Sequence, residues 1–561
     1  MRRLLRRQPR WLASSTSVLL LAGALTVVTN VAPAAPAEAD PVATKWASVD
    51  AGSYHACALT EGGVAYCWGD GSYGALGNGS SSDQPAPVKV TMPSGRIFTR
   101  ISAGTYTTCA IADNGAAYCW GLDGDGQLGN GNPLTDSSVP VAVTMPPGRT
   151  FTDISTGSAT VCAVADNGRV YCWGDDYSGS LGNGGSLPGT DSSVPDEITT
   201  LSGASDVTQN GAHGCALVSG SISCWGYDGD GGLGNGGSDS GTNTSSPVSV
   251  LTLTTATMVE SGTYHLCALV SAGDAYCWGD NYWGAVGTGQ SVPVASGSTV
   301  HSPSKVVGGH VFTDIATGSG VDTCAVDDLG GAYCWGFNGS EALGDGTTDG
   351  NDLNGSTATP QAVYGLSSGV SKVTAGSYFA CALLLTGDIK CWGMDQRGAL
   401  GNGAPINGYS AAPSSLSVTL PYSYVLSVDL QGTGGGSVTS SPAGVSCSAD
   451  CSKSFDDGTA VTLSASATSG STFDGWSGES CSGTGTCTVT LDQARSVWRR
   501  SLLTPRPLLR RRRPLRHRRP LQHRRPLRQR HRRRPTRRPP RRRRHRLNSS
   551  TSASRSTARA A

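Results

Sequence analysis

A repeated Cys-Trp-Gly triplet constrains this chain more than any other feature of its sequence. The triplet occurs seven times between residues 67 and 393, with successive tryptophans 52, 53, 52, 53, 57 and 57 residues apart. Each copy leads into a glycine-rich run that ends in Leu-Gly or Val-Gly, as in "CALTEGGVAYCWGDGSYGALGNG" at residues 57–79. Seven copies at so regular a period predict one continuous repeat array, a propeller or a solenoid, and not a row of separate domains.

The residues within each copy predict β-structure. Short apolar stretches such as "CAL" and "AYCW" alternate with glycine-containing turns, and the chain has 77 glycines among its 561 residues. No copy has room for a long helix. We therefore expect an all-β fold.

A pair of cysteines accompanies every triplet and is centred on a turn. The midpoint of the first pair, Cys57 and Cys67, falls at Gly62, and the midpoints of the next two pairs fall at the asparagines of two Asp-Asn-Gly turns. Cysteines placed symmetrically about a hairpin turn lie opposite each other, close to the separation that a disulfide needs. The fourth pair is one residue shorter, so its turn must differ. The expected bridges are Cys57–Cys67, Cys109–Cys119, Cys162–Cys172, Cys215–Cys224, Cys267–Cys277, Cys324–Cys334 and Cys381–Cys391.

The sequence raises two other roles for these cysteines. Zinc sites use closely spaced cysteine pairs and often a histidine, and one separated pair per repeat cannot supply four ligands. Reduced core thiols would suit a cytoplasmic protein. The N-terminus favours the disulfides, because it has the features of an export signal.

Residues 1–39 are interpreted as a signal peptide. The basic "MRRLLRRQPR" precedes the apolar "SVLLLAGALTVV" and the small residues of "APAEA", which predicts cleavage after Ala39. A membrane anchor would need a longer apolar stretch, and two Arg-Arg pairs raise the alternative of twin-arginine export. No second stretch is apolar enough to span a bilayer. We therefore expect an extracellular or cell-surface protein without a transmembrane segment.

The formal charge of +2 averages segments of opposite character. The chain has 43 Lys and Arg against 41 Asp and Glu, but 26 arginines and no acid lie between Trp498 and the C-terminus. Five more arginines lie in residues 1–10. The body between these ends is therefore strongly acidic, which argues against nucleic-acid binding by the folded domains.

The repeat resembles that of the regulator-of-chromosome-condensation family. The resemblance rests on the pattern Gly-x-x-His-x-x-Ala-Leu, followed by Gly, Trp-Gly and Gly-x-Leu-Gly-x-Gly, as in "GSYHACALTEGGVAYCWGDGSYGALGNG". The resemblance implies a seven-bladed β-propeller, which we place at residues 41–421. The cysteines depart from the nuclear members and suit a secreted branch. The histidine of the pattern is present at residues 55, 213 and 265 and is replaced by Thr107, Thr160, Asp322 and Phe379. We interpret so variable a position as scaffold.

The ends of the array suggest how the ring closes. Proline-led strands such as "PVKV" separate the copies, and the last of them, "PSSLSVTLP" from Pro413, has no triplet after it. The segment before the first copy, "PVATKWASV", is expected to complete that same blade from the other terminus. A ring closed in this way has no exposed strand edge.

A second module follows at residues 423–497. It alternates apolar and polar residues and resembles the divergent internalin B-type repeat of bacterial surface proteins, in "GGGSVTSSP", "GTAVTLSASA", "FDGWSG" and "TVTLD". The expected bridges are Cys447–Cys451 and Cys481–Cys487. In such proteins the module usually serves display or adhesion.

Residues 498–561 are expected to be a disordered tail. From Pro505 to Leu547 every residue except Thr536 is Arg, Pro, Leu, His or Gln, the amino acids whose codons can begin with C. A shifted reading frame would turn this segment into a Pro/Thr/Ala/Ser linker, and would turn Trp498–Arg500 into a strand continuation of the Ala-Thr-Phe type. We hypothesise a frameshift near Val497. The alternative is a genuine basic patch for nucleic acid or heparin.

No catalytic or cofactor motif is present. The runs at Gly121 and Gly226 hint at calcium loops but lack a distal glutamate. We therefore interpret Asp70, Asp123, Asp175, Asp228 and Asp280 as turn residues, and expect neither a metal nor a cofactor.

The leading functional hypothesis is a monomeric binding scaffold that recognises a protein through the loops after Trp-Gly. The alternatives are a nucleotide-exchange regulator of a GTPase, as in the nuclear relatives, and an extracellular glycan-active enzyme. A secreted β-lactamase inhibitor among the relatives makes a protein target plausible. Aromatic side chains are enriched in protein interfaces, although they can also serve packing between blades. The candidate contacts are Tyr73, Tyr177, Tyr227, Tyr282 and Trp283.

Overall fold

The computed structural model describes residues 42–43, 45–132, 134–185, 187–237, 243–290, 298–320, 322–347, 355–404, 408–417, 422–456, 458–478, 481–491 and 495–503. The expected signal peptide and the part of the expected tail after Leu503 lie outside these residues. Among the described segments, none forms a helix with the length and apolarity needed to cross a membrane.

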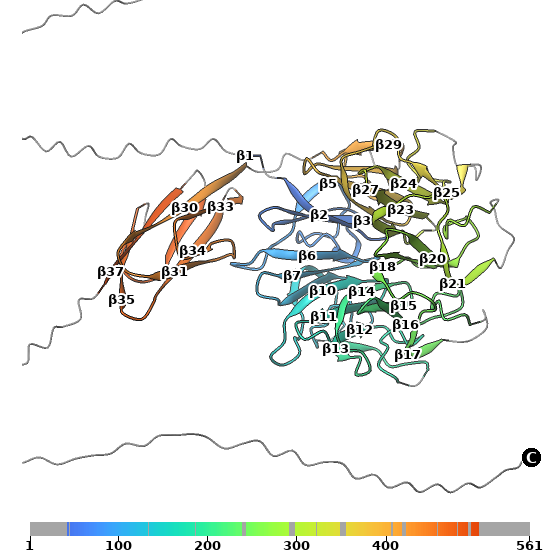
Figure 1. Ribbon diagram of the computed structural model, residues 1–561, viewed down its shortest axis with the longest axis horizontal. Coiled ribbons are helices and arrows are strands. Elements are labelled where there is room, and N and C mark those ends of the chain that lie inside the picture. The colour runs from blue at the N-terminus through green and yellow to red at the C-terminus, as the bar shows by residue number, and fades with distance from the viewer. Residues whose placement is uncertain are drawn as a thin grey trace, which may run out of the picture. The chain divides into compact units, whose positions relative to one another are not determined.

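The repeat region folds as the expected β-propeller. Within the described residues, strands β2 to β29 form seven four-stranded antiparallel sheets, each made of four consecutive strands. We call these sheets blades 1 to 7. Figure 1 shows them in chain order, from the blue strand β2 through green to the orange strand β29.

Blades 1 to 4 comprise the following strands: β2 (Trp46–Ala51), β3 (His55–Thr60), β4 (Ala65–Gly69) and β5 (Gln84–Lys89); β6 (Phe98–Ala103), β7 (Thr107–Ala112), β8 (Ala117–Gly121) and β9 (Ser137–Ala142); β10 (Phe151–Thr156), β11 (Thr160–Ala165), β12 (Val170–Gly174) and β13 (Ser192–Glu197); β14 (Ala204–Asn210), β15 (His213–Val218), β16 (Ser221–Gly226) and β17 (Thr244–Ser249).

Blades 5 to 7 comprise the following strands: β18 (Ala256–Ser261), β19 (His265–Val270), β20 (Ala275–Asp280) and β21 (Thr299–Lys305); β22 (Phe312–Thr317), β23 (Asp322–Asp327), β24 (Ala332–Gly336) and β25 (Thr357–Ala362); β26 (Val370–Ala375), β27 (Phe379–Leu384), β28 (Ile389–Met394) and β29 (Tyr409–Ser415). Short 3₁₀ turns at Ser72–Gly74 and Gln396–Gly398 follow the third strands of blades 1 and 7.

Each blade is bridged by a disulfide across its central hairpin. Cys57 and Cys67 are direct partners in the register of β3 and β4, with their Cα atoms 4.1 Å apart. The same pairing holds in all seven blades, as the spacing of the cysteines predicts. The shorter fourth hairpin turns through Ser219 and Gly220, both at positive φ, which is the geometry of a two-residue hairpin turn.

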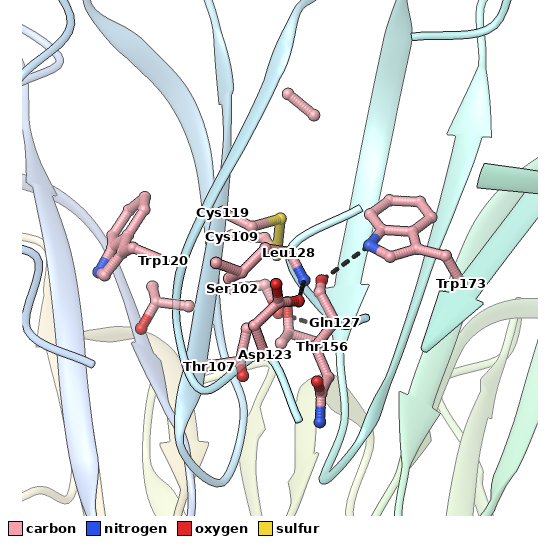
Figure 2. Close-up of a disulfide and its surroundings, with 12 residues drawn as sticks. Ser102, Thr107, Cys109, Cys119, Trp120, Asp123, Gln127, Leu128, Thr156 and Trp173 are labelled. Carbon is pink, nitrogen blue, oxygen red and sulfur yellow. Dashed lines mark hydrogen bonds between the residues drawn. A yellow bond between two sulfur atoms is a disulfide. The ribbon is translucent and has the colours of Figure 1, made fainter. Parts of the chain in front are cut away.

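The Trp-Gly and Leu-Gly motifs join neighbouring blades. The indole of Trp173 in blade 3 donates a hydrogen bond of 2.8 Å to the carbonyl oxygen of Gln127 in blade 2 (Figure 2). All seven repeat tryptophans make the equivalent bond to the preceding blade. Gly129, at positive φ, lies against the Trp173 ring, and a Cβ there would come within 2.6 Å of the indole nitrogen. Glycine follows leucine in the motif because the next blade's tryptophan fills the space of a side chain.

The expected sharing of a strand between the two ends of the array is wrong. Blade 7 is complete within β26–β29, and Trp46–Ala51 forms the first strand of blade 1. The strand that contains Pro413 pairs with β28 of its own repeat, so no place remains in that sheet for the N-terminal segment. Blades 1 and 7 are instead joined by Trp68, whose indole donates to the Ala399 carbonyl at 3.0 Å, and by a backbone bond from Ser377 to Ser53.

The hydrophobic core lies between the blades. One buried cluster combines Leu59 and Leu76 of blade 1 with Phe98 and Trp120 of blade 2. The Phe98 and Trp120 rings stack with their centroids 6.0 Å apart. Each blade therefore depends on both of its neighbours for burial, as expected for a repeat array.

The C-terminal module has two sheets. Strands β1 (Val42–Ala43), β30 (Tyr422–Gly432), β33 (Cys451–Asp456), β35 (Ser471–Ser477) and β37 (Arg495–Leu503) form one sheet, and β31 (Gly436–Ser441), β32 (Ser446–Cys447), β34 (Thr459–Ala467) and β36 (Cys487–Leu491) form the other. The disulfides Cys447–Cys451 and Cys481–Cys487 are present.

The module extends past its expected boundary at Val497. Strand β37 continues to Leu503, because Trp498 to Ser501 pair in parallel with β30. This extension buries Arg499, which is 2% exposed and whose Nε has no hydrogen-bond partner. The first six residues of the expected disordered tail therefore belong to the sheet.

Candidate binding face

Two sets of loops converge at one end of the propeller. Because the strands of a blade are antiparallel, the loop from the first to the second strand and the loop from the third to the fourth start at the same end. Backbone bonds join them: the amide of Asp70 donates to the Tyr54 carbonyl, and the amide of Asp280 donates to the Tyr264 carbonyl. We call this end the loop face. The opposite end, with the disulfide-bridged hairpins and the connections between blades, is the hairpin face.

A side-chain oxygen organises the long loop in most blades. In blade 2, Asp123 Oδ1 accepts a hydrogen bond of 3.0 Å from the amide of Leu128 (Figure 2). Burial raises the pKa of Asp123. Blades 5 and 6 make the same bond with Asn281 and Asn338, so a neutral oxygen suffices. The equivalent acceptors in blades 3, 4 and 7 are Asp176, Asp228 and Asp395.

The aspartates expected to serve turns do so. Besides Asp123 and Asp228, Asp70 accepts the amide of Ser72, and Asp175 accepts that of Tyr177. Asp280 accepts the amide of Tyr282 at 2.8 Å. No group of three His, Cys, Asp or Glu side chains able to hold a metal occurs in the described part of the chain.

The turn bonds hold the candidate aromatic residues at the surface. Tyr177 is 73% exposed, Tyr73 47%, Tyr227 37% and Tyr282 36%. Trp283 is half-buried, with its ring 4.7 Å from Tyr282 and 5.2 Å from Phe337 of the next blade. Some aromatic side chains of this face are therefore exposed to solvent, and others pack between blades.

Sequence reasoning missed a second group of aromatics, which lies in the shorter loops. Tyr54, Tyr106, Tyr264 and Tyr378 occupy equivalent positions in four blades. The Tyr106 ring lies 5.2 Å from Tyr73 and 6.0 Å from Tyr54. Phe337 lies 6.0 Å from Tyr378. The signal was present in "GSYH", "GTYT", "GTYH" and "GSYF", where tyrosine recurs just before the histidine position.

The histidines of the repeat join blades, in agreement with the scaffold interpretation. His55 Nε2 lies 2.8 Å from the hydroxyl of Thr108, and His265 Nε2 lies 2.8 Å from that of Thr323, each in the next blade. His213 bonds to Ser261 in the same way. Burial lowers the pKa of His55 and His213 to about 4 and that of His265 to about 3, so all three are neutral at pH 7.

Asp322 takes the histidine position in blade 6. The residue that would face it in blade 7 is Ala380, which has no hydroxyl, and both carboxylate oxygens of Asp322 lack a hydrogen-bond partner. Its side chain is 1% exposed, and burial raises its pKa well above the usual value. Burial therefore favours the protonated form of Asp322 more than exposure to water would.

The first strands of the blades surround a central cavity of about 290 Å³. Each of these strands carries a single charged side chain. Two of these side chains, Asp153 and Asp206, interact with each other within the cavity. Burial and Asp206 together raise the pKa of Asp153 to about 7. Burial also raises the pKa of Asp314 to about 6. The full set is Asp50, Arg100, Asp153, Asp206, Glu260, Asp314 and Lys372.

Lys372 is the cation around which several of these carboxylates gather. Burial alone would lower its pKa, but Asp50, Asp314 and Glu260 raise it above the usual value. Lys372 therefore stays charged and offsets part of the negative charge inside the ring.

The chain matches the family description "Regulator of chromosome condensation (RCC1) repeat" at residues 62–111, 114–164, 167–217 and 330–383. A second profile of the same description matches residues 46–75, 98–127, 151–180 and 370–399. Residues 426–498 match the divergent InlB B-repeat domain.

Curated relatives share the repeat region. The ultraviolet-B receptor UVR8 of Arabidopsis thaliana is 30% identical over 305 residues, which cover 53% of this chain and 67% of the receptor. The E3 ubiquitin-protein ligase HERC2 of Homo sapiens is 30% identical over 282 residues, which cover 49% of this chain but 6% of that protein.

Solved structures share the fold. Prp20p of Saccharomyces cerevisiae, described with its binding properties to Gsp1p and histones, has a TM-score of 0.52 at 22% identity over 60% of this chain and 81% of that one. Human WBSCR16 has a TM-score of 0.55 at 19% identity over 64% of this chain and 94% of that one.

Proposed function

Because this chain belongs to the family built from the regulator of chromosome condensation (RCC1) repeat, we propose that it is a binding scaffold that recognises a protein partner through its loop face. We further propose that it works outside the cytoplasm, as a secreted or cell-surface protein. Fold membership alone does not assign a partner, so the proposal depends on the chemistry of this face.

The observation that carries the proposal is the group of exposed aromatics on rigid loops. Tyr73, Tyr177, Tyr227, Tyr264 and Tyr282 are between 36% and 73% exposed. Their loops are fixed by side-chain bonds to backbone amides and by backbone bonds between neighbouring loops. Exposed tyrosines on a preorganised surface provide contact area at low conformational cost, which is the usual basis of a protein interface.

The cysteine chemistry supports the proposed location. All 18 cysteines are paired, and the propeller disulfides are fully buried. Disulfides form and persist in oxidising compartments and are uncommon in the cytoplasm.

The test is affinity capture from secreted and cell-wall fractions with the full chain as bait. We expect one protein at a fixed stoichiometry. The combined variant Tyr73→Ser, Tyr177→Ser and Tyr282→Ser should lose it. A matched variant of the hairpin face, Val311→Ser, Leu329→Ser and Leu385→Ser, removes three exposed apolar side chains and should retain it. Equal capture by both variants would overturn the proposal.

A further inference from the structure

The two faces of the propeller differ sharply in charge. In the loops between third and fourth strands, at residues 70–83, 122–136, 175–191, 227–243, 281–298, 337–356 and 395–408, Arg397 is the only Lys or Arg. The shorter loops between first and second strands have no charged residue. The guanidinium of Arg397 lies 2.8 Å from Asp70, so this cation is already paired.

The acids of the loop face fall into two groups. Five are buried in the turns described above: Asp70, Asp123, Asp176, Asp228 and Asp395. Among the described residues, nine others are exposed or half-exposed: Asp83, Asp125, Asp136, Asp175, Asp191, Asp230, Asp280, Glu341 and Asp345. The accessible surface of this face is therefore strongly acidic.

On the hairpin face, four cations form ion pairs with neighbouring acids. Arg96 pairs with Asp113, Arg149 with Asp166, Arg169 with Glu197 and Lys305 with Asp274, at 2.8–3.6 Å. Acidic and basic side chains are mixed on the hairpin face, as on an ordinary solvated surface. The propeller as a whole is acidic, and its excess of carboxylates is concentrated on the loop face.

Carboxylates and tyrosine rings are close neighbours on the loop face. Asp175 binds the backbone amide of the exposed Tyr177, and Asp280 binds that of the exposed Tyr282. Burial, and after it the charge of Asp230, raises the pKa of the Tyr227 phenol. The combination of a carboxylate and an aromatic face attracts Arg and Lys side chains, by charge-assisted hydrogen bonds and by cation–π contact.

We propose that the partner docks a cationic segment, rich in Arg and Lys, on the loop face, with its side chains between the tyrosine rings and the exposed carboxylates. This inference rests on the proposed function and specifies its partner. Two copies do not fit loop face to loop face, because this arrangement would oppose like charges. Nucleic acid is repelled for the same reason.

The test measures binding of a fluorescent peptide of repeated Gly-Arg-Ser-Arg to the full chain by anisotropy. We expect saturable binding that weakens as salt rises from about 50 to about 500 mM. The combined variant Asp125→Asn, Asp175→Asn, Asp230→Asn and Asp280→Asn should bind about tenfold more weakly. Asparagine retains a side-chain oxygen that can accept the amide bonds now made by Asp175 and Asp280, so the loops should stay folded.

The matched control removes four acids from hairpin turns: Asp166→Asn, Asp274→Asn, Asp328→Asn and Asp388→Asn. Its net charge equals that of the loop-face variant, and its affinity should equal that of the native chain. Equal loss in both variants would mean attraction by net charge alone and would overturn the proposal.

Two further outcomes would also overturn it. Peptide binding that occurs only in a chain ending at Thr504 would mean that the protein's own arginine-rich residues 505–561 fill the face. Capture of the partner that is abolished by the tyrosine variant but unaffected by the loop-face asparagine variant would leave the proposed function standing without a cationic partner.

Discussion

The indole Nε1 of Trp68 donates a hydrogen bond to the carbonyl oxygen of Ala399, 331 residues later in the chain, at 3.0 Å. The same bond joins every other pair of neighbouring blades. The ring is therefore closed by the contact that links all its repeats, and no strand is shared between its two ends.

This closure predicts a specific sensitivity at Gly401. A Cβ on Gly401 would lie 2.7 Å from the Trp68 ring, whereas a Cβ on Gly79, also at positive φ, would meet nothing within 4 Å. Both Gly→Ala substitutions strain the backbone, but only Gly401→Ala also displaces the indole. We expect Gly401→Ala to cost about 1–3 kcal/mol more of unfolding free energy than Gly79→Ala, measured by denaturant titration. Equal costs would show that the Trp68 contact is not tightly packed.

Each propeller disulfide should contribute measurably to stability. The Cys57→Ser and Cys67→Ser double variant removes one cross-link whose cysteines are 10 residues apart. The chain-entropy argument gives about 2–3 kcal/mol for a loop of this length. Thermal unfolding of the native and variant chains would measure the loss, and an unchanged midpoint would contradict it. The native disulfides should also resist thiol reductants until denaturant is added, because all seven are buried.

The central cavity predicts that stability depends on pH through Asp153. Its folded-state pKa of about 7 lies above the usual carboxyl value of 3.8. The folded state therefore keeps a proton that the unfolded state releases, so this contribution is present below about pH 4 and is lost as pH rises through 7. Asp153→Asn cannot ionise, and it should raise the free energy of unfolding at pH 8 by about 1 kcal/mol or more. It should have little effect at pH 4.

The other titratable and charged groups near Asp153 must be considered when the native chain is compared with Asp153→Asn. Asp206 is the neighbouring carboxylate, Arg100 lies 3.3 Å from Asp153, and the amide of Val207 donates a hydrogen bond to Asp153. The buried histidines act in the opposite direction, because their lowered pKa values cost stability as pH falls below about 6.5. They are common to both chains, so they cancel in the difference. A stability difference that does not change with pH would contradict this account.

The end of the C-terminal module carries a fourth stability prediction. The buried Arg499 donates to the Gly435 carbonyl at 3.3 Å but leaves its Nε unpaired. The frameshift hypothesis places threonine at this position. Arg499→Thr should therefore raise the free energy of unfolding of the module, by about 1–3 kcal/mol for relief of an unsatisfied buried polar group. Calorimetry would measure it, and mass-spectrometric detection of peptides from residues 498–547 in the natural protein would exclude the frameshift.

The relationships within one repeat could be predicted from the sequence. The cysteine partners, the hairpin turns, the β-structure and the number of blades all depend on residues within about one repeat of each other. Cys57 and Cys67 face each other because both are tied to the same turn, and Asp175 and Asp280 hold turns because their acceptors serve amides two residues away. Spacing along the chain determines such local geometry.

The tertiary structure alone decided which residues of different repeats meet. Tyr106 contacts Tyr73, Asp153 faces Asp206, and Trp68 bonds to Ala399 because the blades are arranged around a ring. The acidic face emerges in the same way, since its carboxylates come from separate loops that share one end of the propeller. A period reveals that repeats are equivalent, but the burial of each blade against its neighbours determines which side chains come together and which remain exposed to a partner.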